Sequence, residues 1–254
     1  MFDLERYSRQ IEIFGIEGQK KLSKSSALVV GAGGLGSAAI QYLAAAGIGR
    51  LGIVDGDVVE KSNLQRQTIH AGNIGMNKAE SAKLFVERLN PEVEVNVYPF
   101  DLTPNNALEL LKGYDVIVGC PDSFRVRFIL NDASFLLKKP LVHAAVYAFE
   151  GELSTFIGSP CYRCYLPKMP PTTGRAIIGA NAGLFGCLQA LEAIKLITGY
   201  GDPLKGKIFR FSAETMTFFE FNIRKRDDCR VCNGELEGIF EENYAGDCEI
   251  VRLK

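Results

Sequence analysis

ALVVGAGGLG, residues 27–36, is the stretch of this sequence that decides its fold. Apolar, strand-forming residues lead into a glycine-rich turn, and a helical pattern then runs from Ser37 through Ala46. Gly31, Gly33 and Gly36 fit the spacing G-x-G-x-x-G, in which glycine permits a tight turn, a close approach of backbone to phosphate and close packing of helix on strand. Because free N–H groups and the positive end of the helix dipole attract an anion there, the stretch predicts a strand, a phosphate loop and a helix.

A second apolar run, Leu51 to Val54, ends in Asp55. This aspartate follows the turn by about 20 residues, the spacing at which a carboxylate reaches the ribose hydroxyls of a nucleotide. We interpret the two features together as an adenine-nucleotide site rather than a structural turn.

Composition narrows the class of protein. With 254 residues, 47% of them hydrophobic and 23% charged, the chain suffices for one large α/β domain or two small ones. The net charge of −1 gives no reason to expect nucleic acid or an anionic membrane as partner. No apolar run approaches the roughly 18–20 residues of a membrane span, and the N-terminus lacks a signal-peptide core, so we expect a cytoplasmic protein.

The rest of the chain alternates strand-like and helix-like segments. This alternation predicts an α/β fold with a doubly wound, mainly parallel, Rossmann-like sheet. Two aromatic-rich runs, IFRFS and MTFFEFNI, are expected to extend the sheet as an antiparallel pair. The other predicted strands are 93–98, 114–119, 141–147 and the run ELSTFIG, and the predicted helices are 103–111, 123–137 and 181–198.

Polar residues gather after the predicted strands, where open parallel sheets bind ligands. Lys78 stands in the first turn of a helix capped by Asn77, so it is either a solvated charge or held by an anion. Asp122 either caps the next helix or contacts a ligand. The other polar residues at these positions are Asp57, Ser62, Asn63, Gln65, Arg66, Gln67 and Ser123.

Two pairs of cysteines have the spacing of metal ligands. Cys161-x-x-Cys164 and Cys229-x-x-Cys232 each place two sulfurs on one tight turn. Four thiolates form a closed zinc site of the structural type, because a catalytic zinc needs an open position. The alternative is four unpaired core thiols.

No arrangement of nucleophile and base can be argued from the remaining cysteines or from the histidines. His143 lies in an apolar strand, Cys120 ends a buried strand and Cys187 lies in an apolar helix, so all three are interpreted as core residues. The sequence favours attack by a carboxylate on a polyphosphate, in which two like charges about 4 Å apart repel by roughly 4 kcal/mol at an effective dielectric near 20. The residues available to offset this repulsion are Arg9, Arg66 and Lys78, with a magnesium ion held by Asp122.

With these residues assembled, the chain resembles the MoeB/ThiF/HesA family, relatives of the ubiquitin-activating enzymes. The matching motifs are RYSRQ, GQKKL, VVGAGGLGSAAIQYLAAAGIGRLGIVDGDVVEKSNLQRQ, GMNKAESA, CPDSFRVR, the two CxxC pairs and GCLQALEAIKLITG. The resemblance implies that Mg-ATP adenylates the C-terminal glycine carboxylate of a ubiquitin-like sulfur carrier, similar to MoaD or ThiS, with release of pyrophosphate.

The resemblance also implies a role for individual residues. It assigns catalysis to Arg9, Arg66, Lys78 and Asp122, with Asp122 as magnesium ligand and Arg9 reaching into the partner subunit's site of a homodimer. Asp55 binds the ribose and Gly34 lies against the nucleotide. The nucleotide-binding set is Gly31, Gly33, Gly34, Gly36, Asp55, Asp57, Ser62, Asn63, Arg66, Lys78, Asp122 and Ser123.

We divide the single expected domain into four parts. Helices over residues 1–25 precede a nucleotide-binding half, 26–150, a carrier-binding and zinc half, 151–232, and an acidic, flexible tail, 233–254. The Gly-Gly tail of the carrier would thread from the C-terminal antiparallel strands toward the phosphates. The sequence does not choose between a carrier for molybdopterin, thiamin, tRNA thiolation or another pathway.

One departure from the family concerns sulfur chemistry. Many relatives carry a cysteine between the first CxxC and the long helix, whereas this segment contains none, and Thr172 and Thr173 stand nearest by spacing. We therefore expect adenylation followed by transfer from a separate sulfur donor. The alternatives are an NAD-dependent oxidoreductase and a non-catalytic binder of a ubiquitin-like protein.

Overall fold

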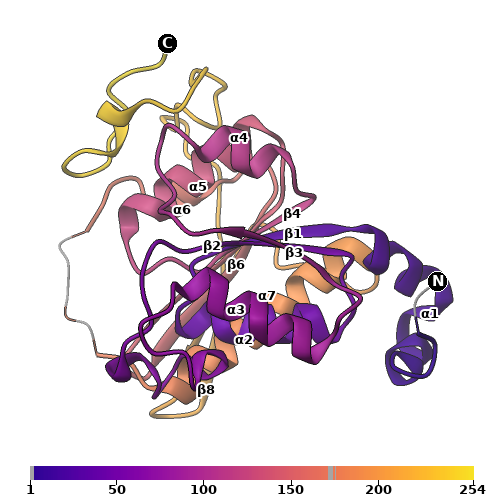
Figure 1. The fold of residues 1–254 in the computed structure, drawn as a ribbon. Helices are drawn as coiled ribbons and strands as arrows, with labels where there is room; N and C mark the ends of the chain where they lie inside the picture. The colour runs from indigo at the N-terminus through magenta and orange to yellow at the C-terminus, as the bar shows by residue number, and fades with distance from the viewer. Residues whose placement is uncertain (1–2, 171–173, 175) are drawn as a thin grey trace.

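The computed structural model describes residues 3–170, 174 and 176–254. The chain folds into an eight-stranded sheet with the strand order β3-β2-β1-β4-β5-β6-β7-β8 (Figure 1). Strands from β3 to β5 in this order run parallel, and β6, β7 and β8 are antiparallel additions. The α/β prediction of a mainly parallel sheet with C-terminal antiparallel strands is confirmed. The strands are β1 Ser26–Val30, β2 Arg50–Val54, β3 Glu94–Tyr98, β4 Val116–Gly119, β5 Leu141–Tyr147, β6 Glu150–Phe156, β7 Lys207–Ser212 and β8 Thr217–Asn222.

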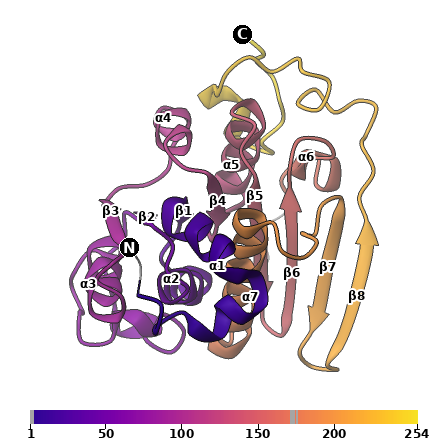
Figure 2. The same ribbon diagram turned by 90° about the vertical axis from the view of Figure 1, so that its right-hand side faces the viewer.

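Helices cover both faces of the parallel part of the sheet. Figure 1 shows α2, α3 and α7 on one face and α4, α5 and α6 on the other, while β7 and β8 extend beyond them at one edge (Figure 2). Each face has its own apolar core, one centred on Ile40 and Phe185 and the other on Phe128 and Tyr162. The helices are α1 Ser8–Lys24, α2 Gly34–Ala45, α3 Lys78–Leu89, α4 Ala107–Lys112, α5 Phe124–Leu136, α6 Tyr162–Tyr165 and α7 Gly179–Thr198.

Strand β1 forms the centre of the fold because both of its faces are covered. All its residues are buried, and it pairs in parallel with β2 and β4. This explains why its sequence is a continuous apolar run rather than an alternating one. The chain turns at Gly31, which has φ of +97°, and a side chain at Gly36 would place its Cβ 2.0 Å from the carbonyl oxygen of Gly31. Both glycines are therefore required by the turn.

The expected N-terminal helices are present. Helix α1 bends at Gly15, where φ is +71°, and packs against α7. Other boundaries shift by a few residues: the predicted helix 103–111 begins only at Ala107, after a turn, and the helix predicted from Asn181 begins at Gly179. Within the described parts of the chain, no helix is both long enough and apolar enough to cross a membrane.

The expectation of a flexible C-terminal tail is wrong. Tyr244 and Cys248 are buried, with 2% and 0% of their surfaces exposed. The Tyr244 hydroxyl donates to Asp132 on α5 at 3.0 Å, and Arg163 on α6 forms an ion pair with the same carboxylate at 2.7 Å. The guanidinium of Arg163 also donates to the carbonyl oxygen of Cys248. These two buried residues hold the segment against the domain. The acidic composition of the segment gave no sign of them.

Candidate functional site

The glycine turn and Asp55 meet at the carboxyl edge of the parallel strands. The N–H groups of Ala32 and Asp57 donate to the two carboxylate oxygens of Asp55 at 2.7 and 2.9 Å. Burial raises the pKa of Asp55 above its usual value, although these two hydrogen bonds oppose the shift. The predicted ribose acid thus also links the end of β2 to the turn that follows β1.

His70 contacts the same turn from the interior of the protein. The sequence did not predict this role. Its ring is fully buried, with Nε2 2.8 Å from the carbonyl oxygen of Ala32 and Nδ1 2.9 Å from the hydroxyl of Ser81. A carbonyl oxygen only accepts, so Nε2 carries the proton and Nδ1 accepts from Ser81. Burial lowers the pKa of His70, and the ring is therefore neutral. Its place beside apolar Ile69 was the only sequence signal for burial.

Lys78 is held by an anion, and that anion is a carboxylate of the chain. Its Nζ lies 2.7 Å from the carboxylate of Asp57. The lysine side chain is 8% exposed, whereas that of Asp57 is 70% exposed. The predicted cap is confirmed, because the side chain of Asn77 accepts from the N–H groups of Ala79 and Glu80. This arrangement presents a buried cation and an open carboxylate together beside Asp55.

The polar segment after β2 forms a short 3-10 helix over Lys61–Asn63. The Asn63 amide oxygen accepts from the backbone N–H of Glu60, so this side chain is partly used to cap the turn. The guanidinium of Arg66 donates to the carbonyl oxygen of Ser62 at 3.2 Å. A side chain at Gly34 would place its Cβ 3.4 Å from Cγ of Arg66. Arg66 therefore packs directly against the start of α2.

A cavity of about 240 Å³ opens beside this contact. The hydroxyl of Ser37, on a residue with 2% of its surface exposed, lines it and has no hydrogen-bond partner among the described residues. The walls come from the start of α2, the segment around Arg66 and the start of α7. The unpaired hydroxyl of Ser37 and the open space beside Gly34, both at the N-terminus of α2, fit a phosphate-bearing ligand.

Asp122 stands next to the glycine turn. A side chain at Gly31 would place its Cβ 2.5 Å from the carbonyl oxygen of Cys120, so the turn touches the chain just before this aspartate. The hydroxyl of Ser123 accepts from the N–H of Val126 and caps α5. Asp122 is therefore not the cap. Its side chain is exposed, and no hydrogen bond to it occurs within the described ranges, which fits a magnesium ligand that completes its shell with phosphate and water.

Arg9 is separated from these residues within one chain. It lies on α1 with its side chain 93% exposed, and its nearest acidic partner is Glu12 at 3.8 Å. Across the described part of this single chain, no contact joins it to the glycine turn or to Asp122. Its role in a second subunit's site stays a prediction, as do the nucleotide and magnesium contacts of the other site residues.

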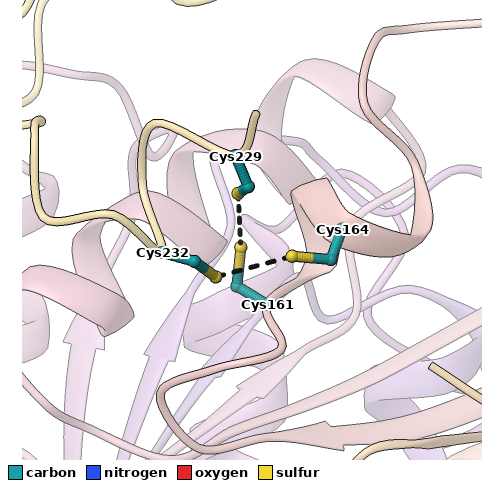
Figure 3. Close-up of side chains that lie close together, drawn as sticks. All are labelled: Cys161, Cys164, Cys229 and Cys232. Atoms are coloured by element: carbon teal, nitrogen blue, oxygen red, sulfur yellow. Dashed lines mark hydrogen bonds between the residues drawn. The ribbon is translucent and has the colours of Figure 1, made fainter. Parts of the chain in front are cut away.

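The two cysteine pairs converge into one cluster (Figure 3). All four sulfurs lie within 4.8 Å of one another. The distance from Cys161 to Cys229 is 3.7 Å and that from Cys164 to Cys232 is 3.5 Å. A tetrahedron with zinc–sulfur bonds of about 2.3 Å has sulfur–sulfur edges of about 3.8 Å. The spacing and the donor type therefore fit a closed four-thiolate zinc site.

Two of the four thiols ionise more readily than a free cysteine. A hydrogen bond from Cys161 lowers the pKa of Cys164 to about 6 and that of Cys232 to about 4, whereas the hydrogen bonds among the four thiols raise the pKa of Cys161. Thiolate is the form that binds a metal. The cluster joins α6 to the segment after β8, two parts of the chain that are distant in sequence.

The prediction of a core position is confirmed for Cys120 and His143, whereas Cys187 is only half-buried. Burial raises the pKa of Cys120 to about 12, and its thiol donates to the side chain of Gln189. His143 is buried and hydrogen-bonded. Cys187 is half-buried in α7. Thr172 and Thr173, which stand nearest to the cysteine position of relatives, lie outside the described residues, as does part of the segment 167–174.

Comparison with known proteins identifies the family of this chain. A sequence model described as ThiF family matches residues 7–231. The SAMP-activating enzyme E1 of Haloferax volcanii is 44% identical over 260 residues, which cover 97% of this chain and 96% of that protein. The adenylyltransferase and sulfurtransferase MOCS3 of Drosophila sechellia is 44% identical over 245 residues, which cover 92% of this chain and 54% of MOCS3. The chain thus spans about half the length of the MOCS3 relatives that it matches.

Solved structures show the same fold at lower identity. The E. coli MccB structure with ATP superposes with a TM-score of 0.82 at 22% identity and covers 89% of this chain and 73% of MccB. PaaA superposes with a TM-score of 0.77 at 24% identity and covers 88% of this chain and 74% of PaaA. These likenesses concern the arrangement of the chain in space.

Proposed function

The chain belongs to the ThiF family, and from this premise we propose that it adenylates the C-terminal glycine carboxylate of a ubiquitin-like sulfur-carrier protein with ATP. The products would be pyrophosphate and an acyl-adenylate that a separate sulfur donor then attacks. The relative of similar length from Haloferax volcanii, named an activating enzyme for SAMP, supports this assignment.

The observation that carries the proposal is the meeting of cationic and anionic groups beside the glycine turn. Lys78 pairs with Asp57 beside Asp55, and Arg66 packs against Gly34 at the start of α2. A hydride-transfer enzyme would use the glycine turn and Asp55 but would have no need of this set. A polyphosphate attacked by a carboxylate needs both cations, because each like-charge contact about 4 Å long costs roughly 4 kcal/mol at an effective dielectric near 20.

Each residue would contribute through binding and electrostatics. The N–H groups at the start of α2 would donate hydrogen bonds to phosphate oxygens, and Asp55 would accept hydrogen bonds from the ribose. Arg66 and Lys78 would hold the triphosphate and stabilise the charge that develops as the carboxylate approaches. Magnesium at Asp122 would neutralise part of the polyphosphate charge. No general base is required, because a carboxylate is already ionised at pH 7.

The carrier is proposed to dock on the antiparallel strands. Strand β8 is the edge of the sheet and exposes Phe218, Phe219 and Phe221 at 55%, 49% and 52%, with Met216 nearby at 68%. Exposed aromatic residues gathered on a single strand are typical of a protein-binding surface. From there the Gly-Gly tail would run toward the phosphates.

We also propose a homodimer in which Arg9 completes the partner's site. The high exposure of Arg9 supports this, because an isolated surface arginine gains little from its single distant partner. Helices α2 and α7 present exposed apolar side chains, Tyr42, Leu184 and Leu191, that a second subunit would cover. Zinc is proposed for the four-cysteine cluster in a structural role.

Pyrophosphate exchange with ATP tests the function. Purified protein, magnesium and each of several small carriers ending in Gly-Gly would be assayed beside the same carrier without its last glycine. Exchange with one intact carrier and none with its truncated form is the expected result. Binding of NAD in place of ATP would overturn the proposal, and ATP binding without exchange across a broad panel would favour a non-catalytic binder.

A further inference from the structure

A line of polar side chains, buried at its inner end, crosses the sheet between the Asp122 loop and strand β7. Its members are Arg127, His143, Glu152 and Arg210, from α5, β5, β6 and β7. None of them belongs to the proposed nucleotide site. A buried polar group that loses its hydrogen-bond partner costs about 1–3 kcal/mol of stability. A line of such groups therefore calls for a functional explanation.

Arg127 anchors the inner end of the line. Its guanidinium donates to the carbonyl oxygen of Pro121 at 2.7 Å and also to the carbonyl oxygen of Ala144. The arginine is 8% exposed. It therefore ties the residue immediately before Asp122 to the middle of β5.

His143 lies between Arg127 and Glu152 and contacts both, with its ring in one tautomer. Nδ1 lies 3.4 Å from the Arg127 guanidinium, and Nε2 lies 3.2 Å from the carboxylate of Glu152. Since arginine only donates, Nδ1 accepts and Nε2 carries the proton that points to Glu152. Burial lowers the pKa of His143, in keeping with a neutral ring.

Glu152 connects the buried line to the surface. One carboxylate oxygen faces His143, and the other accepts from the Tyr165 hydroxyl at 2.8 Å and from the Arg210 guanidinium at 3.0 Å. The Arg210 guanidinium also donates to the Tyr165 hydroxyl at 2.8 Å. Two partners on different elements thus fix the position of the Arg210 guanidinium, although the side chain is 52% exposed.

The face on which Arg210 lies follows from the strand register. A Cβ at Gly151 would collide with Phe185 of α7, so Gly151 faces that helix and Glu152 faces the opposite side. Arg210 pairs with Glu152 on one neighbouring strand and with Phe219 on the other. Arg210 therefore shares the face that carries exposed Phe219 of β8.

We propose that Arg210 is a specificity-determining contact for the carrier and that Glu152 is the residue that positions it, linked through His143 and Arg127 to the Asp122 loop. The proposal rests on the proposed function. Arg127 and Arg210 carry two positive charges against the one negative charge of Glu152, and His143 is neutral. The group thus has a net charge of +1, which selects a carrier with a carboxylate beside its apolar docking surface.

Steady-state pyrophosphate exchange on the whole protein tests this inference. Arg210→Met is expected to raise the KM for the carrier about tenfold, with the KM for ATP and kcat unchanged, because Arg210 does not reach the nucleotide. Glu152→Gln is expected to raise the carrier KM similarly and also to lower kcat, because it loosens both Arg210 and the link to the loop of Asp122.

A matched control lies on the same strands. Lys207 on β7 pairs with Glu220 on β8 at 2.8 Å, both are about half-exposed, and they face the opposite side of the sheet from Arg210. Lys207→Met should leave all the constants unchanged. If Arg210→Met folds and keeps the wild-type carrier KM, the inference fails and the adenylation proposal stands. If the wild-type protein itself shows no exchange with any carrier, both fail.

Discussion

Nε2 of His70 lies 2.8 Å from the carbonyl oxygen of Ala32, inside the glycine turn that would receive the nucleotide. A buried neutral imidazole thus supports the glycine turn from the interior of the protein. The second buried histidine, His143, is neutral for the same reason, since burial lowers the pKa of both rings. Because both rings have a lowered pKa, the stability of the folded protein should depend on pH.

We predict that acid lowers the stability of the protein from about pH 6.5 downward. Below that pH the unfolded chain protonates both histidines, whereas the fold keeps His70 and His143 neutral, so the unfolded state binds more protons. The free energy of unfolding should fall by up to about 1.4 kcal/mol per pH unit for each histidine. Urea unfolding between pH 7.5 and 5 measures this slope. A flat profile above pH 5 would contradict the neutral assignments.

Lys78→Met tests the buried cation. We expect kcat/KM in pyrophosphate exchange to fall at least about 100-fold, because the variant removes the preorganised charge that is proposed to hold the triphosphate. Lys83→Met is the matched control on the same helix, where Lys83 pairs with Glu87 at 3.7 Å and both side chains are well exposed. Equal activities of the two variants would count against the role of Lys78.

Asp122→Asn tests the magnesium ligand. Because Ser123 caps α5, the variant should fold with an unchanged melting temperature and retain its zinc. Exchange should be lost or fall at least about 100-fold, with weaker dependence on magnesium. Ser123→Ala is the complementary variant, which should lower stability by about 1 kcal/mol through loss of the cap. Wild-type turnover in Asp122→Asn would remove the magnesium assignment.

Much of the fold was predictable because its signals are local. The continuous apolar run of β1, the glycine spacing after it and the alternation of strands and helices each depend on neighbouring residues. The Asn77 cap and the two CxxC pairs are of the same kind. In each case the residue type and the backbone conformation that it requires lie within a few positions of each other.

The rest of the site depends on contacts between distant parts of the chain. His70 meets Ala32 across 38 positions, and Tyr244 meets Asp132 across 112. No periodicity encodes such pairs, because they arise only when the sheet and helices have assembled. The C-terminal segment shows this most clearly, since its acidic composition favoured a flexible tail while two buried residues fix it in place.

Tyr244→Phe tests the anchor of this C-terminal segment. The variant leaves the ring in place but removes a hydrogen bond to the buried carboxylate of Asp132, so we expect a loss of about 1.5–3 kcal/mol in the free energy of unfolding. Tyr200→Phe changes an exposed tyrosine and serves as the control, with no expected loss of stability. If the two variants unfold at the same denaturant concentration, the anchor contributes nothing.

Removal of the metal should affect the same region, because the cysteine cluster joins α6 to the segment after β8. We expect one zinc ion per chain by elemental analysis, and loss of that ion in Cys161→Ser. Since a structural zinc stabilises the folded state directly, the variant and the chelated wild-type protein should both melt at lower temperature. Cys187→Ser, which lies outside the cluster, should keep its zinc and its melting temperature. Full zinc content in Cys161→Ser would show that the ion is held elsewhere, whereas a metal-free wild-type protein with the same melting temperature after zinc addition would leave the four thiols as core residues.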